Sequence, residues 1–116
     1  MLKGLIDGFA FKDLTSQCTV ASTYCDSVKV MGNGTINFAI GRAKTNTPDQ
    51  TTLITFPSSI RPSNVVCGNV FHMNGVDQGK DATVAILGGG ILQFRASSNI
   101  TGSSGIRFSI VWLTGM

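Results

Sequence analysis

The chain has 116 residues, the length of a single domain, which excludes a two-domain enzyme. Charged residues make up only 13% of the chain, about half the share in an ordinary soluble domain, so Ser, Thr, Asn and Gly must cover much of the surface. The net charge of +3 reflects a shortage of acidic residues, and no two basic residues are adjacent. This pattern disfavours nucleic-acid binding.

The composition favours strands over helices. Every acidic residue is Asp, and Thr, Ser, Gly, Val and Ile outnumber the good helix formers. The longest apolar stretch, residues 84–92, is too short to span a membrane and contains Gly88-Gly89-Gly90. The N-terminus lacks the apolar run of a signal peptide. We therefore expect an all-β protein that neither inserts into a membrane nor is secreted by that route.

In chain order, residues 1–26 show no clear period and are expected to be a lead-in or edge segment. A single domain is expected over residues 27–116. It begins with a hairpin of residues 27–31 and 35–43 around the turn Gly32-Asn33-Gly34. In the second strand Ile36, Phe38 and Ile40 alternate with small or polar residues, which is typical of a strand half-buried on its apolar side.

Five further strands are expected, separated by turn residues. They cover residues 51–56, residues 65–73, Ala82–Leu87, Ile91–Ala96 and Ile106–Leu113. Short strands at such spacing predict an antiparallel β-sandwich of the jelly-roll type. The last strand places Ile106, Phe108, Ile110 and Trp112 on one face, but Val111 and Leu113 make its other face apolar too. Either it is a central strand of the sandwich, or it is buried against another chain.

Catalytic and metal sites are not expected. Cys18, Cys25 and Cys67 are an odd number, which favours free thiols packed as small apolar groups. The only histidine, His72, lacks companions at metal-ligand spacing and the neighbours of a catalytic triad. We expect no cofactor and no enzyme activity.

Polar side chains that could bind a ligand gather between residues 72 and 81. This segment holds the only histidine, two Asp, an Asn and a Gln, and such groups on a loop between rigid strands suit a hydroxyl-rich ligand. A connecting hairpin tip of no function has the same composition. The candidate ligand-binding residues are His72, Asn74, Asp77, Gln78 and Asp81, with Arg95 on the following hairpin. The loops of residues 42–50 and 97–105 are the alternatives.

The order of segments resembles the C-terminal domains of bacteriophage tail fibres and baseplate receptor-binding proteins. The resemblance covers the hairpin of residues 28–38, the stretch Thr-Phe-Pro-Ser-Ser-Ile-Arg-Pro-Ser at residues 55–63, and the strands around residues 84–86 and 91–94. Those domains often carry one segment with a fixed order: leucine-proline, then small residues, then a bulky aliphatic or aromatic residue, and then Arg-Pro-Ser. Here Phe56 stands where the leucine is common, and Ile60 is the bulky residue.

This resemblance implies a homotrimer at a phage tail tip, made in the bacterial cytoplasm and located in the virion. Its partners would be other tail proteins and a saccharide of the host cell surface. Two functions follow from it: host recognition through glycan binding without catalysis, or a purely structural trimerisation or capping role.

Overall fold

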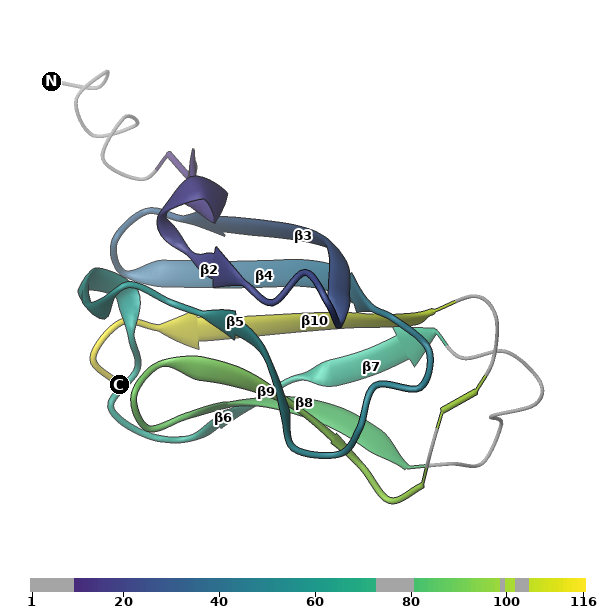
Figure 1. The fold of residues 1–116 in the computed structure, drawn as a ribbon. Coiled ribbons are helices and arrows are strands. Elements are labelled where there is room, and N and C mark those ends of the chain that lie inside the picture. Colours follow the sequence, from purple (N-terminus) through teal and green to yellow (C-terminus); the bar gives the residue numbers. More distant parts are fainter. Residues whose placement is uncertain (1–9, 73–80, 99, 102–104) are drawn as a thin grey trace, which may run out of the picture.

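The computed structural model describes residues 10–72, 81–98, 100–101 and 105–116, and they form two antiparallel sheets (Figure 1). In sheet A the strand order is β1 (Lys12–Asp13), β3 (Cys25–Gly32), β4 (Ile36–Ala43), β10 (Ile106–Leu113) and β7 (Asn69–His72). In sheet B the order is β2 (Thr19–Val20), β5 (Thr51–Thr55), β9 (Ile91–Ala96), β8 (Ala82–Leu87) and β6 (Val66–Cys67). The helical elements described are two 3-10 turns, η1 (Thr15–Gln17) and η2 (Ser58–Ile60). The predicted all-β class is confirmed, in a sandwich-like arrangement.

Both predicted hairpins form where the turn residues placed them. In the β3–β4 turn Gly34 has a φ of 93°, and the Asn33 side-chain oxygen accepts the backbone N–H groups of Thr35 and Ile36 at 3.0 and 2.8 Å. In the β8–β9 turn Gly89 and Gly90 have φ values of 84° and 74°. These left-handed conformations strain any residue with a Cβ, which is why glycine marks both turns.

The single strand predicted over residues 65–73 is divided into β6 and β7, because the chain changes sheets within it. β6 pairs with β8 in sheet B, whereas β7 pairs with β10 in sheet A. The crossing point is Gly68, whose N–H still donates to Val84 O in sheet B at 2.7 Å. A Cβ on Gly68 would lie 2.6 Å from Ser109 O. Only glycine lets the backbone pass this close to β10.

The core between the sheets is built on aromatic side chains. Phe108 and Trp112 from β10 are buried, and the Trp112 ring centroid lies 4.7 Å from that of Phe56. The indole Nε1 of Trp112 donates to Ile60 O at 2.6 Å. This bond ties η2 to sheet A. The expected inward face of the last strand, with Ile106, Phe108, Ile110 and Trp112, is confirmed.

The expected inward face of β4 is wrong. Ile36 and Ile40 are 40% and 45% exposed, whereas Asn37 and Ala39 are fully buried. Small residues are needed on the inner side because the large rings of β10 occupy the core. A Cβ on Gly41 would lie 2.7 Å from Cζ of Phe108. The outer face of sheet A is therefore apolar around Ile36 and Ile40.

Residues within the predicted lead-in segment join both sheets as edge strands. β1 pairs with β3, and β2 pairs with β5.

Candidate functional site

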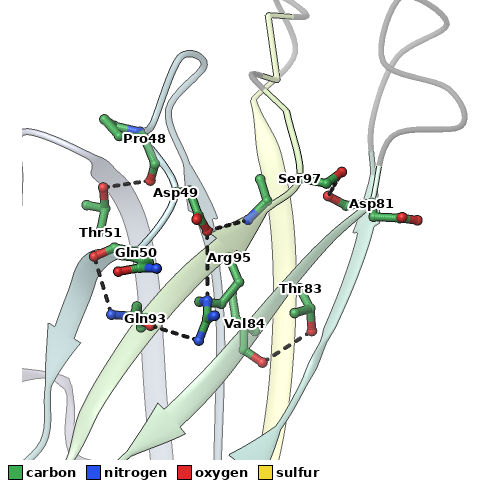
Figure 2. A network of polar contacts seen from close by, with 11 residues as sticks. Pro48, Asp49, Gln50, Thr51, Asp81, Thr83, Val84, Gln93, Arg95 and Ser97 are labelled. Atoms are coloured by element: carbon green, nitrogen blue, oxygen red, sulfur yellow. Dashed lines mark hydrogen bonds and ion pairs between the residues drawn. The ribbon is translucent and has the colours of Figure 1, made fainter.

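A concave site of about 380 Å³ lies on the outer face of sheet B, where β8 begins and β9 ends (Figure 2). Strand register builds it, because Thr83 is directly opposite Arg95 and Ala82 is opposite Ala96. Side chains alternate along a strand, so Thr83 and Arg95 share the outer face. The loops on either side complete the site, which is lined by Asp49, Asp81, Ala82, Thr83, Arg95, Ala96 and Ser97.

Asp49 holds the loop of residues 44–50 against the end of β9. Its Oδ1 accepts the N–H of Ala96 at 2.9 Å and lies 3.8 Å from Nε of Arg95. The loop is also fixed through its backbone, because Gln50 donates its N–H to Phe94 O at 2.8 Å. The Asp49 carboxylate and the Arg95 guanidinium therefore face the same space from two different segments.

The Arg95 guanidinium belongs to a polar row on the outer face. Its Nη1 donates to the Gln93 side-chain oxygen at 3.4 Å, and Gln93 Nε2 donates to Gln50 O at 3.3 Å (Figure 2). Each of these contacts is long and exposed. The donors of Arg95 thus remain accessible to a ligand.

The other side of the site presents oxygen atoms. The Asp81 carbonyl accepts both the N–H and the hydroxyl of Ser97, at 3.1 and 3.4 Å. Its carboxylate is directed away from Arg95 in Figure 2 and has no hydrogen-bond or ionic partner among the described residues. The Thr83 hydroxyl donates to Gly68 O at 2.9 Å, which leaves its lone pairs as acceptors. The Asp49 carboxylate, the Arg95 guanidinium and the hydroxyls of Thr83 and Ser97 can together bind a polyhydroxylated ligand.

Of the predicted site residues, the structure brings Asp81 and Arg95 into one cavity. His72 instead ends β7 in the other sheet, where its register partner is Arg107. Asn74, Asp77 and Gln78 lie outside the described residues.

Asp49, Thr83 and Ser97 were missed as site residues. The only signal for Asp49 was its place in the polar loop of residues 42–50, which was an alternative location for the site. Its contact with β9 depends on the β5–β9 pairing that sets Thr51 opposite Phe94. No local pattern reveals that pairing.

The three cysteines are free thiols, as predicted. Burial raises the pKa of the Cys18 and Cys25 thiols, so both are protonated at neutral pH. Cys67 is exposed, so the expectation that all three pack as apolar groups is wrong for this residue. In the described ranges no three His, Cys or Asp side chains are grouped to hold a metal ion.

No helix in the described part of the chain has the length and apolar character needed to cross a membrane. Comparison of the chain with protein-family models, with curated proteins and with solved structures gives no match.

Proposed function

We propose that the chain is a bacteriophage tail or baseplate component that recognises a host by binding cell-surface saccharide without catalysis. The observation that supports this proposal is the cavity in which Arg95 and Asp49 lie beside the hydroxyl groups of Thr83 and Ser97, with Asp81 on its rim. Sugar hydroxyls need several donors and acceptors at fixed positions, and sites on rigid strands supply them. Here the strand pair β8–β9 supplies that rigidity.

The site is open, so a single copy would bind weakly. Several copies in one particle would raise the overall affinity because each later contact is intramolecular. A homotrimer with jelly-roll-like subunits, carried at the tail of the virion, would combine three such sites.

The double variant Asp81→Ala with Arg95→Ala is expected to lose at least ten-fold in affinity for the saccharide. The loss of about two charge-assisted hydrogen bonds accounts for this size. Binding would be measured to a panel of bacterial cells and immobilised bacterial polysaccharides. The melting temperature should change little, because exposed substitutions usually alter stability by only about 0.5 kcal/mol.

Lys12→Ala is the control for this experiment, because Lys12 is exposed on β1 and lies outside the site. It should bind as the parent does. If the double variant also binds as the parent does, the proposed site is wrong. If the parent binds no member of the panel, the structural role takes the place of host recognition.

That second role, a structural virion component, is favoured by the outer face of sheet A. Five of the exposed large hydrophobic residues lie on or beside it: Phe11, Ile36, Ile40, Val111 and Leu113. The strand register makes these residues contiguous, because Ile36 is opposite Leu113 and Val111 is opposite Phe38. The ring centroids of Phe38 and Phe11 are 5.7 Å apart. Monomeric proteins rarely leave so continuous an apolar face to water. Sheet B, in contrast, presents Gln93 and Arg95 outward.

Val111→Lys is expected to convert a trimer to a monomer, because it places a charge in the middle of this face. Val111 is 64% exposed, and Val65, which directly precedes β6 of sheet B, is 61% exposed. Val65→Lys is therefore the matched control and should remain trimeric. Light scattering in dilute solution distinguishes the states, and a parent mass near 12.2 kDa would contradict the assembly.

A further inference from the structure

A second concave site lies on the outer face of sheet A. It measures about 410 Å³ and crosses the neighbouring strands β3, β4 and β10. Each of these strands contributes one basic side chain to it: Lys29, Arg42 and Arg107. Among the described residues no acidic side chain lines the cleft.

Two of the three cations are held in place from outside the cleft. Lys29 Nζ lies 3.0 Å from Asp13 Oδ2. Nε and Nη2 of Arg42 donate to the two carboxylate oxygens of Asp26 at 2.9 and 3.1 Å. This fork fixes the plane of the Arg42 guanidinium and leaves its Nη1 without a hydrogen-bond partner in the described part of the chain.

Both acidic partners are ionised at neutral pH. Hydrogen bonds from the side chain and the backbone of Thr15, followed by Lys29, lower the pKa of Asp13 to about 2. Hydrogen bonding by Arg42 lowers the pKa of Asp26. Each acid offsets the charge of one cation, so the uncompensated charge of the cleft belongs to Arg107.

Arg107 stands directly opposite Arg42 in the β4–β10 pair. Its side chain is exposed, and its guanidinium has no hydrogen-bond or ion-pair partner among the described residues. Like charges at opposed positions destabilise a sheet, and two guanidinium groups facing one cleft favour an oxyanion between them. A guanidinium is suited to this task because its donors match the spacing of phosphate, sulfate and carboxylate oxygens.

We infer that this cleft binds a sulfate, phosphate or carboxylate group of an acidic saccharide. That a saccharide carries this group rests on the function proposed above. That the group is an anion rests on Arg107 and on the free Nη1 of Arg42 in the cleft. Ile40, which is 45% exposed, also lines the cleft and offers apolar contact to a sugar ring. On this outer face, Arg107 is opposite Arg42, and Val111 is opposite Phe38. The outward-facing pair Ser109 and Ile40 lies between these two pairs.

The test measures binding of dextran sulfate and of uncharged dextran to the full chain by calorimetry at low salt. Dextran sulfate is expected to bind more tightly than dextran, and Arg107→Ala to weaken dextran sulfate binding about ten-fold, the effect of losing one charge-assisted contact. Lys12→Ala removes the same charge from β1, outside the cleft. It should change the affinity less than Arg107→Ala does, because Lys12 does not line the cleft.

An equal loss in Lys12→Ala and Arg107→Ala would mean that net charge alone attracts the polymer, and would overturn the inference. Tighter binding of single-stranded DNA, lost in Arg107→Ala, would overturn the saccharide class in favour of nucleic acid. Binding of cells or neutral polysaccharide in the Arg107→Ala variant, with dextran sulfate binding lost, would support two separate sites. Two separate sites would also be supported if the Asp81→Ala, Arg95→Ala variant lost cell binding but kept its affinity for dextran sulfate. The two proposals can thus fail independently.

Discussion

Gly68→Ala is expected to destabilise the protein by about 2–3 kcal/mol, the upper part of the range for a side chain forced into a filled space. The added Cβ would lie 2.6 Å from Ser109 O and 2.7 Å from Cβ of Ile110. Neither neighbour can yield easily, because one is backbone and the other branches at Cβ within β10. The change would separate β6 from β7 at the point where the chain passes between the sheets.

Gly88→Ala is the matched control. Gly88 lies in the β8–β9 turn, has no positive φ, and a Cβ there would meet nothing within 4 Å. This substitution should be neutral or slightly stabilising, by up to about 1 kcal/mol, through the lower entropy of the unfolded chain. Urea unfolding compares the two variants with the parent. Equal stability of Gly68→Ala and Gly88→Ala would show that the close approach of residue 68 to β10 is not needed.

Trp112→Ala is expected to cost about 3–5 kcal/mol, the usual effect of removing a buried aromatic side chain. Trp112 is 2% exposed, packs on Phe56 and hydrogen-bonds to Ile60. The variant would leave a cavity and an unpaired carbonyl at the same time. We expect it to lower the free energy of unfolding more than any surface substitution named above.

Trp112→Phe separates the two contributions. It keeps an aromatic ring but removes the Nε1 donor, which lies 2.6 Å from Ile60 O. Because Ile60 is only 4% exposed, its carbonyl would be left unpaired. An unsatisfied buried carbonyl costs about 1–3 kcal/mol. Val65→Ala, at an exposed position, should change the free energy of unfolding by less than about 0.5 kcal/mol. A Trp112→Phe variant as stable as the parent would mean that the hydrogen bond to η2 contributes nothing.

The candidate site was only partly predictable from the sequence. Asp81 and Arg95 were candidates because they are polar residues near a predicted turn, and the β8–β9 hairpin places both beside one cavity. Asp49 was not a candidate residue, because its contact with Ala96 and Arg95 joins segments that are distant in the chain. His72 was expected with them, but the change of sheet at Gly68 carries it to β7 and sheet A.

By itself, the sequence determined what depends on near neighbours. Glycines with positive φ mark the β3–β4 and β8–β9 turns, and alternating apolar residues mark the strands beside them. The tertiary structure alone decided which side of β4 is buried. Ile36 and Ile40 alternate as core residues do, yet they face outward because Phe108 and Trp112 fill the space that their side chains would need. Alternation shows that a strand has two different faces, but the packing volume between the sheets selects the inner one.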